Sequence, residues 1–184
     1  MIWIILGIIV VLIFAAMGIY NGLVASRQQV DNAWAQIDVQ LKRRYDLIPN
    51  LVETVKGYMN FEQTTLQKVV EARSAAMGAS GGGVKAQAEA ENNLTRALGG
   101  FFAVAEQYPD LKASENMGRL QEELSSTENK IAFARQFYND AVMTYNTKTQ
   151  QFPGSIFANM FGFKQKELFE LVEPEQREPV KVSF

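Results

Sequence analysis

Residues 37–58 read IDVQLKRRYDLIPNLVETVKGY, and this stretch decides the fold. From Leu41 to Val55, apolar side chains recur at alternating steps of four and three residues. That spacing is typical of the buried face of a helix. Because it continues unchanged across Pro49, it predicts one helix kinked at the proline, not two helices joined by a turn. The kink leaves the carbonyl of Tyr45 without the N–H of residue 49.

Three consecutive cations, Lys42, Arg43 and Arg44, lie one turn before the proline. A solvated helix face accounts for Lys42 and Arg43, and Asp38 is placed to pair with Lys42 at i,i+4. Arg44 falls beside the apolar face. We therefore expect Arg44 to pair with a carboxylate of another helix.

Upstream of this stretch, residues 2–19 are uncharged and almost wholly apolar. As a helix they span about 27 Å, close to the hydrocarbon thickness of a bilayer. Trp3 and Tyr20 mark the two ends, where aromatic rings prefer the headgroup level. We interpret residues 1–21 as a transmembrane anchor. A cleaved signal peptide is the alternative, but it would have a basic n-region and a small-residue cleavage site.

The cations that follow the apolar run favour a cytoplasmic domain after the anchor, with the N-terminus outside. Gly18 and Gly22 form a GxxxG pair at the membrane exit, which is compatible with close packing of two anchors. One such pair is common by chance.

Four stretches after the anchor carry helical spacing and predict an all-α protein, in which a transmembrane helix precedes a long antiparallel helical bundle over residues 22–152. The longest is about 54 Å as a helix and needs partner helices of similar reach, packed as in a coiled coil. Its apolar face comprises Met117, Leu120, Leu124, Thr127, Ile131, Ala134, Tyr138, Ala141, Tyr145, Lys148 and Phe152.

Glycine and proline punctuate these stretches. The glycine-rich residues 78–84 predict a flexible turn, and they lack the Gly-Lys-Ser/Thr ending of a phosphate-binding loop. Pro153 and Gly154 end the longest helix. Residues 153–184 change character, with an aromatic segment followed by an extended, proline-broken tail that we expect to drape on the bundle.

Ile156, Met160 and three phenylalanines crowd the aromatic segment. Packing against the end of the bundle is one interpretation. Contact with the membrane interface is the other, since lysines stand nearby. The candidate membrane-interface residues are Trp3, Tyr20, Phe157, Phe161 and Phe163.

A polar line runs one residue after the apolar face of the longest helix. Its members, Glu128, Arg135, Asn139 and Asn146, are spaced 7, 4 and 7 residues apart. Asn and Arg at this position indicate hydrogen bonds to another helix, whereas an ordinary exposed boundary is the alternative. With Arg44, these four residues form the candidate interface.

Composition argues against several classes of function. The 184 residues carry a formal net charge of −2, so the overall balance is not that of a nucleic-acid binder. The sequence has no cysteine and no histidine, and no HExxH, GxSxG, Walker A or dinucleotide motif. We expect no enzymatic activity, no metal and no cofactor.

Three stretches of the sequence resemble the LemA family of bacterial membrane proteins. They are residues 37–58, EARSAAM at residues 71–77, and ENKIAFARQFYNDAVMTYNTKTQQFPGSIFANMFGF at residues 128–163. The resemblance covers nearly the whole chain. It implies a single N-terminal anchor, a helical bundle in the cytoplasm, and no established enzymatic activity or cofactor. It also implies an association with membrane proteases.

These features lead to two hypotheses of function. The first is a non-enzymatic scaffold of the bacterial cell membrane that associates with itself, its other partner being the lipid bilayer. The second is an adaptor that regulates a membrane protease or sensor through the same polar line. Neither hypothesis involves nucleic acid.

Overall fold

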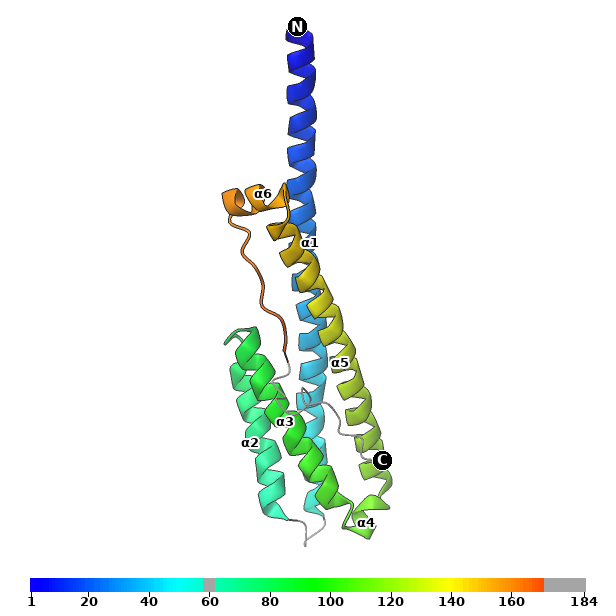
Figure 1. The fold of residues 1–184 in the computed structure, drawn as a ribbon. Coiled ribbons are helices and arrows are strands. Elements are labelled where there is room, and N and C mark those ends of the chain that lie inside the picture. The colour runs from blue at the N-terminus through cyan, green and yellow to red at the C-terminus, as the bar shows by residue number, and fades with distance from the viewer. Residues whose placement is uncertain (58–61, 171–184) are drawn as a thin grey trace, which may run out of the picture. The chain divides into compact units, whose positions relative to one another are not determined.

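A computed structural model describes residues 1–57, 62–170 of the chain (Figure 1). The chain divides into two compact units, and each is described by itself. Unit 1 comprises Met1–Gln40 and Lys130–Leu168, and unit 2 comprises Leu41–Asn129 and Phe169–Phe184. Helices form the secondary structure of the described residues, which confirms the predicted all-α class.

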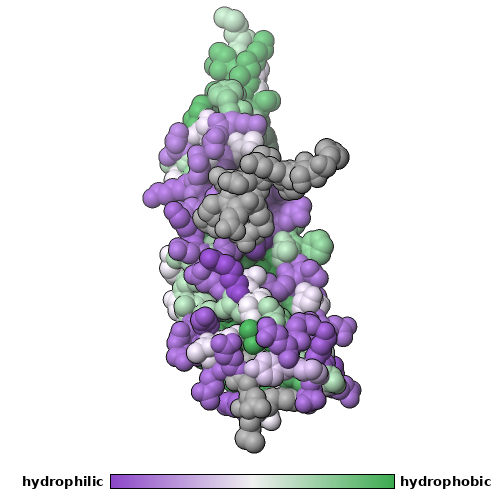
Figure 2. Space-filling view, turned by 60° about the horizontal axis from the view of Figure 1, so that its bottom comes forward, coloured by the Kyte–Doolittle hydropathy of each residue, from purple (hydrophilic) through white to green (hydrophobic). Residues whose placement is uncertain are grey.

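The first helix, α1, extends over Ile2–Lys56 and contains Pro49 in its interior. The predicted continuity of the helix through Pro49 is therefore confirmed. A window within α1 is long and apolar enough to cross a membrane, and none of it is buried in the structure. On the face drawn in Figure 2, hydrophobic residues gather over the N-terminal part of α1. Such a fully exposed apolar surface is suited to a membrane anchor.

Unit 2 is a bundle built from the end of α1, helices α2 (Gln63–Ala79) and α3 (Val84–Ala105), the short α4 (Pro109–Lys112), and the start of α5 (Glu115–Gln150). Successive long helices alternate in direction (Figure 1). Glycines with positive φ, Gly81 and Gly83, turn the chain between α2 and α3, inside the predicted 78–84 turn. The bundle core includes Leu41, Ile48, Leu51, Val55, Val69, Leu94, Phe101, Leu111 and Leu124.

In unit 1 the part of α1 that follows its apolar run packs against the antiparallel second part of α5. The Trp34 and Tyr138 rings meet edge to face, with centroids 5.3 Å apart. Lys148 Nζ near the end of α5 donates to Ser26 Oγ of α1 at 2.6 Å. A last helix, α6 (Gly154–Phe161), follows α5 and lies crosswise to α1 in Figure 1. The unit 1 core includes Leu23, Val30, Ile37, Ile131, Tyr138, Val142 and Tyr145.

Some expectations from the sequence were wrong. Lys148 and Phe152 are exposed and do not belong to the buried face of α5. Phe152 lies beyond the end of α5 at Gln150, and next to Lys148 it is Thr149 that is buried. The tail after Glu170 lies outside the described residues, while Phe169 just before it is buried.

Candidate functional site

A cluster of buried polar side chains lies inside unit 2, centred on Arg44 of α1. The side chain of Arg44 is 1% exposed. Its guanidinium donates to Glu91 of α3 and Glu128 of α5, and to Thr95 Oγ1 at 2.9 Å. This arrangement confirms the expectation that Arg44 pairs with a carboxylate of another helix. A charge so deeply buried needs such partners, because desolvation of an unpaired ion is very costly.

The next residue of α1, Tyr45, extends the cluster toward α2. Its hydroxyl donates to Glu91, and Gln87 Nε2 donates to the same carboxylate at 2.6 Å and to the carbonyl of Ala76 at 3.3 Å. Burial and the hydrogen bond to Glu91 raise the pKa of Tyr45 far above its usual range, so its hydroxyl stays protonated as a donor. These contacts fix the register of four helices. They leave the carboxylates occupied as acceptors and do not resemble a catalytic pair.

Arg73 of α2 supplies the hydrogen-bond donor that Pro49 removes from α1. Because proline has no N–H, the carbonyl of Tyr45 lacks its usual donor four residues on. Arg73 Nε donates to this carbonyl at 2.8 Å. The proline in α1 and the arginine in α2 are thus a matched pair within unit 2.

In unit 1, three side chains of α5 hold the segment after α6. We call residues 162–168 the strap. Tyr138 and Tyr145 donate to the carbonyls of Glu167 and Lys164, each at 2.9 Å. Asn146 donates to the carbonyl of Lys166 and accepts from its N–H, both at 2.9 Å. Burial, followed by the charges of Glu167 and Asp31, raises the pKa of Tyr138 to about 12.

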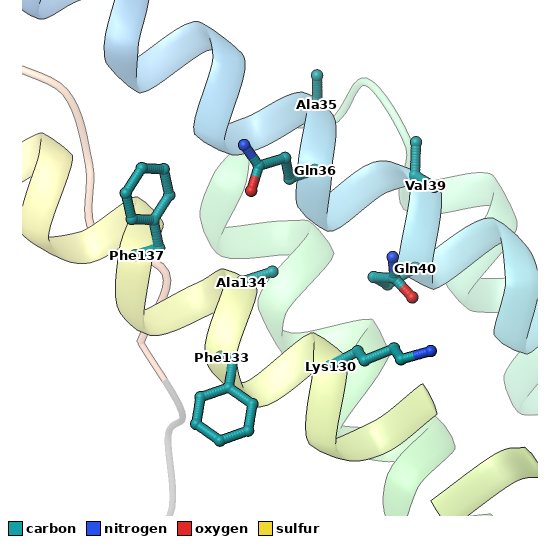
Figure 3. A pocket seen from close by; sticks show the side chains of 8 residues that line it. All are labelled: Ala35, Gln36, Val39, Gln40, Lys130, Phe133, Ala134 and Phe137. Carbon is teal, nitrogen blue, oxygen red and sulfur yellow. The ribbon is translucent and has the colours of Figure 1, made fainter. Parts of the chain in front are cut away.

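An open groove of about 580 Å³ lies between α1 and α5 of unit 1 (Figure 3). Val39 of α1 and Phe133 of α5 are 64% and 72% exposed beside it, and Phe137 is also exposed. Gln40 Oε1 is buried at the groove and has no hydrogen-bond partner among the described residues. The lining residues are Ala35, Gln36, Val39, Gln40, Lys130, Phe133, Ala134 and Phe137.

The structure separates the candidate interface residues into different places. Arg44 and Glu128 pair with each other inside unit 2, and Asn146 holds the strap in unit 1. Arg135 and Asn139 are half-buried on α5 and also have interactions within the chain. The polar line of α5 is therefore used at least in part inside the chain.

The candidate membrane-interface residues also differ in position. Trp3 is exposed, and Tyr20 contacts the rings of Phe161 and Phe163 edge to face. Phe157 stacks on Phe161. Phe163 is buried under Tyr20, and Arg27 lies over its ring, so this phenylalanine does not face outward. Of the two interpretations of the aromatic segment, the position of Phe163 matches packing against the protein.

Sequence reasoning missed Gln87, Glu91, Arg73 and the aromatic groove. Gln87 and Glu91 were detectable in principle. They continue the helical spacing of Leu94, Leu98 and Phe101, and a glutamate inside an apolar face signals a buried partner. In the part of the chain that the structure describes, no group of acidic residues is placed to hold a metal ion.

These features define an all-helical protein with a candidate membrane-spanning helix and a bundle fixed by buried polar contacts. The sequence profile of the LemA family matches residues 33–184, and the chain belongs to this family.

Curated relatives extend this result. Protein LemA of Metamycoplasma hominis is 27% identical over 163 residues, covering 89% of this chain and 74% of that protein. Magnetosome protein MamQ 2 of Paramagnetospirillum magneticum is 26% identical over 175 residues, covering 82% of this chain. Magnetosome protein MamQ of Magnetospirillum gryphiswaldense is 24% identical over 174 residues, also covering 82%. This chain spans 64% of the length of these two MamQ proteins.

Proposed function

We propose that the protein is a non-enzymatic, membrane-anchored scaffold of the bacterial cell membrane that associates with further copies of itself. The observation that carries this proposal is the groove of unit 1. Large apolar side chains usually avoid water when they are gathered in one place. Val39, Phe133 and Phe137 are gathered at the groove and exposed.

A second copy is the occupant that we propose for the groove. Residues along one stripe of α1 are spaced four and three apart, and all of them except the half-buried Gly22 are exposed: Gly18, Gly22, Ala25, Gln29, Asn32, Gln36 and Val39. No neighbouring atom fills the space beside Gly18 or Gly22. Anchored copies enter the bilayer in the same direction, so matching residues of two copies lie at the same depth. In a parallel pair, we propose that the two stripes face each other from the anchor to the groove.

Polar groups beside the groove suit the same contact. The unsatisfied Gln40 Oε1 needs a donor, and a buried acceptor without one costs about 1–3 kcal/mol. Amide side chains of Gln36 or Asn32 on a neighbouring copy supply such donors. The half-buried Arg135 and Asn139 of α5 remain candidate contributors to this interface.

We further propose a single-pass topology with the N-terminus outside and the bundle in the cytoplasm. Arg27 follows the apolar run within two turns, and further cations follow at residues 42–44. Cations near a span are retained on the cytoplasmic side.

The test is the particle mass of the detergent-extracted protein, measured by size-exclusion chromatography with light scattering. We expect the wild type to be a homo-oligomer and the Phe133→Ser, Phe137→Ser variant to have a lower mass with unchanged helicity in circular dichroism. Met143→Ser is the matched control, because Met143 is exposed on α5 but does not line the groove.

Two results would contradict the proposal. An unchanged mass of the double variant would show that the groove does not hold the copies together. A monomeric wild type would overturn the scaffold altogether and favour the adaptor, whose membrane protease or sensor partner would then have to be identified.

A further inference from the structure

Helix α6 presents an apolar surface that nothing in unit 1 covers. Ile156, Met160 and Phe161 are exposed, and so is Phe152 just before the helix. Ala158 is buried, and Phe157, which stacks on Phe161, is half-buried. The eight residues of α6, GSIFANMF, include no charged side chain.

Two contacts place α6 at the end of the apolar part of α1. Phe161 and Phe163 meet the ring of Tyr20, with centroids 4.9 and 5.7 Å away. Tyr20 directly follows the apolar residues 2–19. Tyrosine at the end of a span prefers the level of the headgroups. Because Figure 1 shows α6 crosswise to α1, α6 runs along the membrane surface when α1 crosses the membrane.

Two glycines fix this direction. A side chain at Gly154 would place its Cβ 2.3 Å from the carbonyl oxygen of Lys148, so only glycine permits the turn out of α5. Gly162 ends the helix with φ of 71°, in the left-handed region that favours glycine. The two glycines thus determine where α6 begins and where it ends.

Cations lie on the side of α6 away from the apolar span. Arg27 is over the Phe163 ring at 5.2 Å, and Lys148 contacts Ser26. Lys166 pairs with Asp31 at 3.2 Å, and Lys164 is exposed beside it. Arg27 lies seven residues beyond Tyr20, which is about 10 Å along a helix. Apolar side chains bordered by cations at this depth match the boundary between acyl chains and phosphates.

We propose that α6 is a membrane-interface helix that inserts Phe152, Ile156, Met160 and Phe161 into the bilayer crossed by α1. The bilayer is the occupant because the apolar surface of α6 is continuous, through Tyr20, with the apolar surface of the anchor. The helix gives the protein a second lipid contact, which limits tilting of α1. This proposal rests on the anchoring part of the proposed function and is independent of self-association.

The absence of cysteine allows a direct test on the full chain. A nitroxide label is attached to Met160→Cys, in nanodiscs of phosphatidylcholine and phosphatidylglycerol that hold one chain each. Collision rates with oxygen, which partitions into lipid, and with an aqueous nickel chelate report the depth of the label. Met143→Cys is the matched control, since Met143 is also an exposed methionine of unit 1. Ile9→Cys reports insertion of α1.

We expect the Met160 label to collide with the nickel chelate several-fold less often than the Met143 label and more often with oxygen. Equal nickel accessibility at the two positions, with the Ile9 label in lipid, would overturn the α6 proposal alone. An Ile9 label accessible to nickel would overturn the anchor and the α6 proposal together. Since each disc holds one chain, protection of Met160 by a second copy is excluded by design.

Discussion

At the scale of single residues, Pro49 and Arg73 show how one position imposes a requirement on another. Proline inside a helix removes a backbone donor and usually destabilises the helix by about 3 kcal/mol. The Arg73 guanidinium replaces that donor at the Tyr45 carbonyl, from a different helix of unit 2. The bond therefore also joins α1 to α2 at the same place.

The first residue-scale prediction is that Pro49→Ala and Arg73→Ala are coupled. In the wild type, loss of Arg73 leaves the Tyr45 carbonyl without a donor, so Arg73→Ala lowers the free energy of unfolding by about 1.5–3 kcal/mol. In the Pro49→Ala background the new N–H of residue 49 satisfies that carbonyl, and the same change costs clearly less. Urea unfolding of the detergent-solubilised chain, followed by circular dichroism, measures the four values of the cycle.

The control for this cycle is Arg96→Ala. Arg96 is an exposed arginine whose side chain donates to Asn93 on the same helix, α3, so its loss should change stability by no more than about 0.5 kcal/mol. Additive effects of Pro49→Ala and Arg73→Ala would show that the arginine does not substitute for the missing donor.

The limits of sequence reasoning are also clear at residue level. The burial of Tyr138, Ala141 and Tyr145 on α5 followed from spacing alone, because local periodicity determines which side of a helix faces its partners. The role of Glu91 did not follow from spacing, because its partner Arg44 lies 47 residues earlier in the chain. Pairing between distant residues depends on how helices are arranged, which periodicity does not specify.

At the scale of elements, the strap explains why the polar line of α5 contains an asparagine. The two hydrogen bonds between Asn146 and the main chain of Lys166 match an amide side chain to an extended backbone. The position of Asn146 beside the apolar face of α5 predicted that its side chain makes hydrogen bonds. It did not distinguish a neighbouring molecule from the chain's own C-terminal segment, because both offer the same donors and acceptors.

We predict that Asn146→Ala releases the strap locally. Two of the four hydrogen bonds that Tyr138, Tyr145 and Asn146 make to it are lost, so amide hydrogen exchange of residues 164–167 should become faster, while exchange in α2 and α3 stays unchanged. Thr144→Ala is the control, since Thr144 is exposed on the same helix. Slow exchange of the strap in Asn146→Ala would mean that the two tyrosines suffice to hold it.

At the scale of the whole molecule, the long helices make each unit a product of distant parts of the chain. Unit 1 joins Met1–Gln40 to Lys130–Leu168, so the apolar anchor, the groove and α6 belong to one unit. The buried ionic cluster belongs to the other. The surfaces that we propose for lipid and for further copies thus belong to unit 1, whereas the ionic cluster belongs to unit 2. Substitutions in the groove should therefore leave the bundle of unit 2 folded.

The topology of the membrane-embedded protein provides the last prediction. Arg27 and residues 42–44 place positive charge after the apolar run, and by the positive-inside rule this predicts a cytoplasmic bundle. A single cysteine at Ser80, exposed between α2 and α3, should therefore resist an impermeant maleimide in spheroplasts and react once the membrane is permeabilised. Ile2→Cys, at the opposite end of the apolar run, should react in both conditions. Labelling of Ser80→Cys in sealed spheroplasts, with Ile2→Cys protected, would reverse the orientation and place the bundle outside the cytoplasm.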